Sequence, residues 1–315
     1  MKKIFTIIAL TIGFSMNAQV STDGTNPSGT NASAIGKNTT ASATSSTAMG
    51  ASTIASGPHS TAMGNGTTAS QESSTAMGAS TIASGPRSTA MGESTTASAE
   101  CSTAMGHNTT ASGEYSTAMG TFTAASANFS TAMGYFTTAS DYGSLVIGTY
   151  NSSLSSVTTN GSATAYDADN TAFVIGNGAS SGSKSDAFKV MFNGDATVGN
   201  DLTVSGDVVV NSDMRLKANI ISLGSTLYKL LQIDGKTYTM KRDATQKQKI
   251  GVLAQDIEKV FPELVVEHNG IKSVNYQGLV PVLINSIKEQ DAKMKEQDAK
   301  ISRLEALVEK LISNK

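Results

Sequence analysis

The chain has 315 residues, with 23 Lys or Arg against 25 Asp or Glu and a net charge of −2, so no basic surface points to nucleic acid. Aromatic residues make up only 5%, Trp is absent and there are 29 Gly, which is too polar for one large globular core and would indicate disorder without a repeat. The single Cys excludes an intrachain disulfide, so stability must come from another source.

The first 18 residues have the layout of a secretory signal peptide. Lys2 and Lys3 precede an apolar run at 4–16, and the small residue Ala18 marks the expected cleavage point. The alternative, a transmembrane anchor, needs about 20 apolar residues, and this run is shorter. We therefore expect an exported protein, extracellular or at the cell surface, with no transmembrane segment in the mature chain.

A 14-residue unit runs through residues 19–150, and its copies end in Ser-Thr-Ala-Met-Gly. The Met recurs at Met49, Met63, Met77, Met91, Met105, Met119 and Met133. Ile35 and Ile147 continue the same phase at the two ends. A period this short and regular predicts a solenoid, in which each turn packs only against its neighbours.

Comparison of the copies separates packed positions from loop positions. Thr recurs four residues after each Met and Ala-Ser follows two residues later, as in Thr53 and Ala55-Ser56, whereas the next three positions vary. Each unit predicts two short strands, around Thr-x-Ala-Ser and Ser-Thr-Ala-Met-Gly, with a turn after each. The Gly after Met permits a backbone conformation that other residues resist, and Pro58 and Pro86 fall in the variable turn. Alternation places each Met on the same face as the Thr two residues earlier.

A roll this narrow buries little apolar area, because Thr and Ala contribute weakly per residue. Self-association of several chains would give the Met rows a shared core, and we expect it. A single-chain solenoid with sealed ends is the alternative.

The repeated Ser-Thr-Ala-Met-Gly and the later Ser144-Leu145-Val146-Ile147-Gly148 resemble the Ser-Val-Ala-Ile-Gly units of YadA-like trimeric autotransporter adhesin heads. The resemblance covers about residues 33–150, with a weaker echo at Phe173-Val174-Ile175-Gly176, in phase two periods later. It implies a trimeric left-handed parallel β-roll that binds a host or matrix surface.

The variable positions hold chemically conspicuous residues. Four of them share one slot, four residues before Met: His59, Cys101, Tyr115 and Phe129. We interpret these residues, and His107 in a neighbouring slot, as exposed decoration and not as a metal or catalytic set. Together with Tyr115 and Phe129, the later turns gather the aromatic residues Phe122, Tyr135 and Phe136. A contact surface and closure of the end of the roll explain this clustering equally well.

Residues 151–211 join the repeats to a different kind of sequence. Residues 151–184 are rich in Ser, Gly, Asn and Thr and predict a loop. Short strands are then expected at 187–192, 196–198, 202–204 and 208–210, each followed by turn residues. Strands at this spacing predict a narrow β-stalk.

Residues 212–285 have the charged and apolar proportions of a small α+β domain. The pattern predicts a helix at 220–231, a strand at 236–241, a helix at 251–260, and a hairpin of 264–266 with 271–276 around Asn269-Gly270. Segments 212–220, 250–265, 274–276 and 283–288 resemble the intramolecular chaperone domain at the end of endosialidase tail spikes. This resemblance spans about residues 211–290. It implies a domain that trimerises, helps a β-structured fibre to fold, and then cuts itself off.

The same resemblance implies the site residues. Ser212 would attack the carbonyl of the Asn211–Ser212 bond, Lys217 would act as its base, Asp213 and Arg215 would shape the turn, and Gln255 belongs to the supporting motif. The chemistry fits, since a Ser hydroxyl needs a base and a Lys of lowered pKa can serve. The activity would be at most a single-turnover Ser-Lys endopeptidase. The alternative is that Ser212 caps a helix and Lys217 is a solvated side chain.

Residues 286–315 predict a coiled coil. Ile287, Met294, Ile301 and Val308 fall seven apart, and three residues after each come Gln290, Gln297, Leu304 and Leu311. The Gln residues weaken the seam and help to fix its register. A trimer agrees with both resemblances, although the heptads alone leave a dimer open.

The sequence therefore predicts an exported homotrimeric surface or fibre protein, with an adhesin-like head and a C-terminal trimerisation chaperone that cleaves itself before Ser212. Its partners would be its own copies and a host, matrix or glycan surface, with no cofactor, metal or nucleic acid. Two alternatives stay open: a phage-derived tail fibre that binds carbohydrate, and a Thr-rich ice-binding solenoid.

Overall fold

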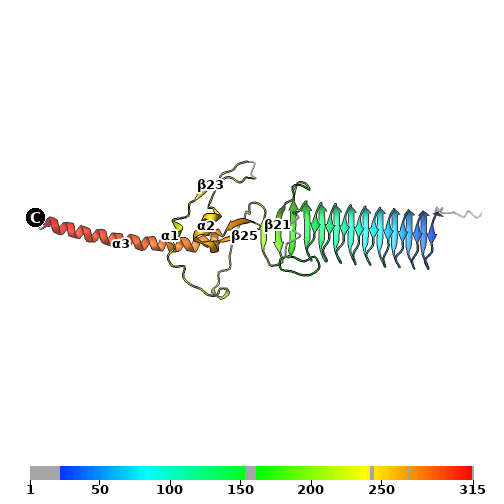
Figure 1. The fold of residues 1–315 in the computed structure, drawn as a ribbon, viewed down its shortest axis with the longest axis horizontal. Helices are drawn as coiled ribbons and strands as arrows, with labels where there is room; N and C mark the ends of the chain where they lie inside the picture. Colours follow the sequence, from blue (N-terminus) through cyan, green and yellow to red (C-terminus); the bar gives the residue numbers. More distant parts are fainter. Residues whose placement is uncertain (1–21, 153–160, 242–244, 269, 314–315) are drawn as a thin grey trace, which may run out of the picture. The chain divides into compact units, whose positions relative to one another are not determined.

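The computed structural model describes residues 22–152, 161–241, 245–268 and 270–313 (Figure 1). These residues form two compact units, divided between Asp207 and Val208. The predicted signal peptide, residues 1–18, lies outside the described residues. Among the described residues, no helix combines the length and the apolar character needed to cross a membrane.

The N-terminal unit is a roll with two parallel sheets, whose strands stack side by side in Figure 1. The longer strand of each unit lies in one sheet: β1 (Thr22–Asp23), β3 (Ser33–Lys37), β5 (Thr47–Ala51), β7 (Thr61–Asn65), β9 (Thr75–Ala79), β11 (Thr89–Glu93), β13 (Thr103–His107), β15 (Thr117–Thr121), β17 (Thr131–Tyr135) and β19 (Leu145–Thr149). The shorter strand lies in the other: β2 (Asn26–Pro27), β4 (Thr40–Ala41), β6 (Ile54–Ala55), β8 (Thr68–Ala69), β10 (Ile82–Ala83), β12 (Thr96–Ala97), β14 (Thr110–Ala111), β16 (Ala124–Ala125) and β18 (Thr138–Ala139). The prediction of two strands per unit is confirmed.

Within each sheet of the repeat region, neighbouring strands come from consecutive units. Met49 on β5 lies beside Met63 on β7, and Ala55 on β6 lies beside Ala69 on β8. Equivalent residues therefore form continuous columns along the roll.

Small side chains fill the interior of the Met-containing turns, and Val146 and Val174 continue it beyond them. In one turn, Ala48, Thr53, Ala55 and Ser60 are each 0% exposed. Met49 alternates with the buried Ala48 and is 37% exposed, so it faces outward, as predicted, with the Thr two residues earlier. The Thr four residues after each Met thus lies inside the roll. The Thr two residues before each Met lies on the outer face, beside the Met.

The glycine after each Met is required by backbone geometry. From Gly36 to Gly134 these glycines have φ between +113° and +126°. A Cβ on Gly92 would also lie 2.0 Å from the backbone oxygen of Gly106 on the next turn. The predicted need for a backbone conformation that other residues resist is confirmed, and the close approach of the next turn adds a second reason.

The first of the three variable positions is more restricted than we expected. Gly57 is buried, and a Cβ there would lie 2.0 Å from the backbone oxygen of Gln71. A Cβ on Gly85 would likewise lie 2.0 Å from the backbone oxygen of Ala99. Gly alternates at this position with a larger residue in the next turn, so only the second and third positions are open loop positions.

The sequence echo after the repeats is a further strand of the same sheet. The strand β20 (Thr171–Asn177) pairs in parallel with β19, placing Ile175 beside Ile147. The antiparallel strands β21 (Asp186–Met191) and β22 (Ala196–Val198) follow, close to the expected 187–192 and 196–198. The two other expected stalk strands, at 202–204 and 208–210, do not form in the single chain, and their apolar residues are exposed.

Polar side chains terminate the roll. The Asn151 side chain accepts from the Thr138 N–H at 2.8 Å and donates to the Thr138 carbonyl at 3.0 Å. A carboxylate oxygen of the buried Asp141 accepts from the Thr171 N–H at 2.8 Å. The Asn151 contacts occupy backbone groups of the last short strand, β18, which would otherwise form a free edge, whereas the Asp141 contact holds the first residue of β20.

The C-terminal unit is a small α+β module with a long helix. Its elements are α1 (Leu227–Leu230), β23 (Lys236–Tyr238), β24 (Lys249–Gly251), α2 (Ala254–Val260), β25 (Val265–His268), β26 (Ile271–Val274) and α3 (Leu279–Ser313), with 3-10 turns η1 (Met214–Leu216), η2 (Pro262–Leu264) and η3 (Tyr276–Gly278). Strands β23 and β24 pair antiparallel, as do β25 and β26. Ile257, Val260, Phe261, Leu264 and Val282 form the core.

The predicted elements of this module are present but their bounds differ. The hairpin is confirmed, and the helix expected at 251–260 is α2, which begins at Ala254. The helix expected at 220–231 is reduced to α1, because Gly224 has φ +65° and the residues before it are exposed. The long helix α3 has 35 residues and begins at Leu279, ahead of the expected 286.

Candidate functional site

The predicted site residues at the start of the C-terminal module are brought together by one tight turn. The Asp213 side chain caps η1 by accepting from the Arg215 N–H at 2.8 Å, and the Lys217 N–H closes the turn on the Met214 carbonyl. This turn places the side chains at positions 212 and 217 next to each other. Lys217 Nζ donates to Ser212 Oγ at 2.8 Å.

Asp213 and Arg215 form a two-point contact beside this pair. Arg215 Nη2 lies 2.7 Å from Asp213 Oδ2, and Nε lies 3.1 Å from each carboxylate oxygen. The Arg215 side chain holds the pKa of Asp213 below its ordinary value, and the carboxylate raises the pKa of the guanidinium. The cap of the turn is therefore Asp213, and not Ser212 as the alternative interpretation supposed.

The whole segment is exposed in the single chain. Asn211, Ser212 and Lys217 are all exposed, and the neighbouring Met214 and Leu216 are 73% and 71% exposed. Two large apolar side chains exposed to water next to Ser212 and Lys217 indicate a surface that other copies can cover.

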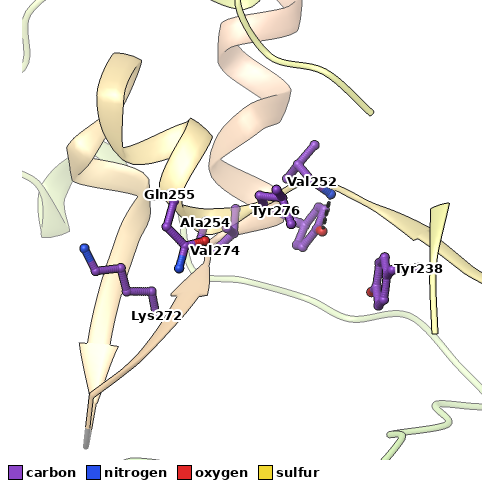
Figure 2. Close-up of a pocket in the computed structure, with 8 residues that line it drawn as sticks. Tyr238, Val252, Ala254, Gln255, Lys272, Val274 and Tyr276 are labelled. Carbon is purple, nitrogen blue, oxygen red and sulfur yellow. Dashed lines mark hydrogen bonds between the residues drawn. The ribbon is translucent and has the colours of Figure 1, made fainter. Parts of the chain in front are cut away.

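Gln255 lies elsewhere in the module, in the first turn of α2. It lines a cleft of about 240 Å³ with Tyr238, Val252, Leu253, Ala254, Lys272, Val274 and Tyr276. Figure 2 shows Gln255 and Lys272 at one end of this cleft and Tyr238 at the other. Ser212 and Lys217 do not line it, so the structure unites four of the predicted site residues and leaves Gln255 separate.

Two contacts of the module were not predicted. Val252 N–H donates to Tyr276 Oη at 3.1 Å, and this hydrogen bond joins the segment just before α2 to η3 (Figure 2). Glu289 on α3 accepts hydrogen bonds from Ser225 and from the first residues around α1. No local pattern could show either contact, because the partners are 24 or more residues apart in the chain.

The variable positions of the roll lie in its turns, as predicted. His59, Cys101, Tyr115 and Phe129 all have φ between +52° and +59°. Arg87 in the same slot donates from Nε to Cys101 Sγ at 3.3 Å and forms an ion pair with Glu100. Among the described residues, no three His, Cys, Asp or Glu side chains are grouped so that they could hold a metal ion.

The aromatic residues form two stacks along the turns. The first stack contains Tyr115, Phe129 and Tyr142, and the second contains His107, Phe122, Tyr135, Phe136 and Tyr150. The Tyr115 and Phe129 rings lie 5.0 Å apart and parallel, and the Phe122 and Phe136 rings lie 4.4 Å apart. Successive turns are thus joined by stacked rings and by edge-to-face contacts, such as that between Phe129 and Tyr142.

Two segments match known protein families. Residues 28–53, 55–81, 83–100, 101–123 and 125–151 match the YadA head domain repeat (2 copies), and residues 212–266 match the chaperone of endosialidase. Comparison with curated proteins found no match. The two predicted resemblances are confirmed by these matches. The repeat region is therefore similar to adhesin heads and the C-terminal module to an intramolecular chaperone, and both families imply trimerisation.

Proposed function

We propose that the chain is an exported homotrimeric surface or fibre protein whose C-terminal module assembles three chains and then cleaves itself before Ser212. The contact between Lys217 Nζ and Ser212 Oγ at 2.8 Å carries the cleavage part of this proposal. The matches to the YadA head repeat and to the chaperone of endosialidase support the assembly part.

The faces of α3 support assembly through a shared helix seam. Its buried residues, Val282 and Ser286, face the rest of the module. The heptad positions on another face are 44–70% exposed, and their apolar members are Val280, Leu283, Ile287, Met294, Ile301, Leu304, Val308 and Leu311. Leu307 and Ile312 widen this stripe near the end. A stripe this long and apolar is covered when helices of other copies pack against it.

The Met column of the roll would supply a second interface. Met49, Met63 and Met119 are each 37–38% exposed, and one such side chain follows another along the whole sheet. Packing three Met columns together would bury this apolar surface without any change in the small-residue interior.

The cleavage chemistry follows from the Ser212–Lys217 pair. Lys217, as a neutral amine, takes the Ser212 hydroxyl proton while Oγ attacks the carbonyl carbon of Asn211. A carbon–oxygen ester bond forms, the carbon–nitrogen bond breaks, and Lys217 returns the proton to the departing nitrogen of Ser212. Water then hydrolyses the ester, leaving a carboxylate on Asn211 and restoring the Ser212 hydroxyl.

Assembly would switch this chemistry on. A lysine is a base only in its neutral form, and burial favours that form. In one chain Ser212 and Lys217 are exposed, whereas three copies can cover them together with Met214 and Leu216. Cleavage would thus follow assembly.

The benefit of the arrangement is mechanical. A coiled coil that holds three chains in register lowers the entropic cost of starting parallel β-structure. Removal of the assembly module afterwards would leave the fibre kinetically trapped. The two aromatic stacks, with Tyr115 and Phe129 each 49% exposed, would form part of the surface that meets a host, matrix or glycan partner.

Expression of the full chain beside Ser212→Ala tests the cleavage. We expect two fragments, divided between Asn211 and Ser212, from wild type and a single intact chain from Ser212→Ala, with both proteins trimeric by sedimentation. Ser222→Ala is the matched control, because Ser222 is an exposed hydroxyl of the same segment and should leave cleavage unchanged. An intact wild-type trimer would refute self-cleavage, and a monomer would refute the assembly.

A further inference from the structure

Glu289 of α3 holds the chain at a point that follows the cleavage segment. Its carboxylate accepts from Ser225 Oγ at 2.6 Å and from the Leu227 N–H at 3.2 Å, and it also accepts from the Thr226 N–H. These donors are one side-chain hydroxyl and two backbone N–H groups, from the two residues before α1 and from its first residue. A single carboxylate thus gathers three consecutive residues of another segment.

The surroundings make this contact rigid. Thr226 is 2% exposed, and its hydroxyl lies 2.8 Å from Ser286 Oγ and 3.0 Å from the Val282 carbonyl oxygen. The hydrogen bond from Ser225, and then those from Thr226 and Leu227, lower the pKa of Glu289, so its carboxylate stays charged at neutral pH. Charge-assisted hydrogen bonds of this kind are stronger than neutral ones.

The position of this contact in the chain gives it a role beyond packing. Within the described part of the chain, the hydrogen bonds of residues 212–224 stay inside that segment, apart from a long one from Asn285 Nδ2 to the Gly224 carbonyl at 3.4 Å. Glu289 is therefore the first strong attachment after Ser212. It lies on the same helix as the heptad seam, two residues after Ile287.

We propose that Glu289 is a positioning residue for cleavage: it ties the Ser212–Lys217 segment to the coiled-coil helix, so that trimer register fixes where the segment lies. This inference rests on the proposed self-cleavage. Attack of Ser212 on its own preceding carbonyl demands an accurate backbone arrangement, and small displacements of reacting groups cost large factors in rate. An anchor that begins at Ser225, eight residues after Lys217, restricts the places that the segment can reach.

The alternative is that Glu289 only stabilises α1. The two roles differ in what they predict for a conservative change, measured in an intact trimer. Glu289→Gln keeps an oxygen that can accept from the backbone N–H groups, and its amide can donate to Ser225 Oγ. Glu289→Ala keeps none of these contacts.

The experiment measures the cleavage rate of the full-length chain by intact mass, with the trimer fraction measured by sedimentation in the same samples. We expect Glu289→Ala to slow cleavage about 10- to 100-fold and Glu289→Gln to restore it to within about threefold of wild type. Glu296→Gln is the matched control, since Glu296 occupies the same heptad position one repeat later and pairs only with the exposed Lys300 in the described residues. It should cleave at the wild-type rate.

Should Glu289→Ala fail to trimerise, Ser225→Ala decides, because it removes one hydrogen bond to Glu289 and leaves α3 unchanged. It should slow cleavage severalfold in an intact trimer. The positioning role would be overturned, with self-cleavage still supported, if a trimeric Glu289→Ala protein cleaved at the wild-type rate. If Glu289→Ala is not trimeric, the same result from Ser225→Ala would overturn it. A Glu289→Gln protein that cleaves as slowly as Glu289→Ala would also overturn it. A wild-type trimer that never cleaves would refute the proposed cleavage and this inference together.

Discussion

The roll and the C-terminal module differ in how much of their apolar surface is buried within one chain. Each turn of the roll encloses its own interior, in which residues such as Ala48 and Thr53 are 0% exposed within one chain. Among its described residues the module has a core of five buried apolar residues and leaves its apolar heptad residues 44–70% exposed. The roll is therefore complete within a chain except for its outer Met face, whereas α3 presents half of a core that other copies must complete.

The difference also concerns register. Neighbouring turns of the roll are nearly identical, so a slip by one whole unit would still place Met beside Met and Ala beside Ala. The contacts that distinguish one turn from another are few, such as Arg87 with Glu100 and the aromatic stacks near β17 and β19. A segment that fixes alignment from outside the repeats is most useful to a fold of this kind.

The largest effect should come from disrupting the seam of α3. Ile301→Asp puts a charge at the centre of an apolar stripe, where burial of an unpaired carboxylate is costly. We expect loss of the trimer and, with it, of cleavage, measured by sedimentation and intact mass. Ala299→Asp adds the same charge two residues away, outside the seam, and should remain trimeric. A trimeric Ile301→Asp protein would show that the roll alone holds the chains together.

The next effect concerns the roll itself. Gly92→Ala combines a forbidden φ of +113° with a Cβ 2.0 Å from a backbone oxygen. The backbone strain costs about 1–3 kcal/mol and the overlap a similar amount, so urea unfolding should show a loss of about 2–6 kcal/mol. Gly66→Ala is the matched control: its φ is +62° and its nearest neighbour would lie 3.8 Å away, so its loss should be about 1–2 kcal/mol. Equal losses would mean that the close approach of turns does not matter.

Periodicity predicted the repeat region almost completely. A 14-residue period fixes which residues become neighbours, and alternation within five residues fixes which face each one takes. The restriction at Gly57 was missed because it depends on the backbone of the next turn, which no single unit reveals. The sequence Phe173-Val174-Ile175-Gly176 repeats the pattern of the earlier units two periods later. Because of this gap in the sequence, the pattern did not show that β20 lies directly beside β19.

The module was less predictable because its contacts join residues that are distant in sequence. Residues 220–231 have helical spacing, yet Ile220 and Ile221 are exposed and lie outside α1 in a single chain. The pairing of Ser212 with Lys217 was implied by the family resemblance, and the turn capped by Asp213 explains it locally. The attachment at Glu289 had no sequence signal, because a charged residue beside a heptad seam is ordinarily solvated.

The smallest effect should be the titration of Asp213, which tests the turn at the boundary between the two regions. Its native pKa is lowered, chiefly by the Arg215 side chain, so its contribution to stability is present above the unfolded pKa, near 3.8, and is lost as the pH falls through the lower native value. Carboxyl NMR titration of the Ser212→Ala protein should give a midpoint below 3.8, and Arg215→Ala should raise it. Lys259→Ala is the matched control, because Lys259 lowers the pKa of Asp256 and should leave Asp213 unchanged. An Asp213 midpoint that does not respond to Arg215→Ala would show that the two-point contact does not hold the turn, and the alignment of Ser212 with Lys217 would then need the other chains from the start.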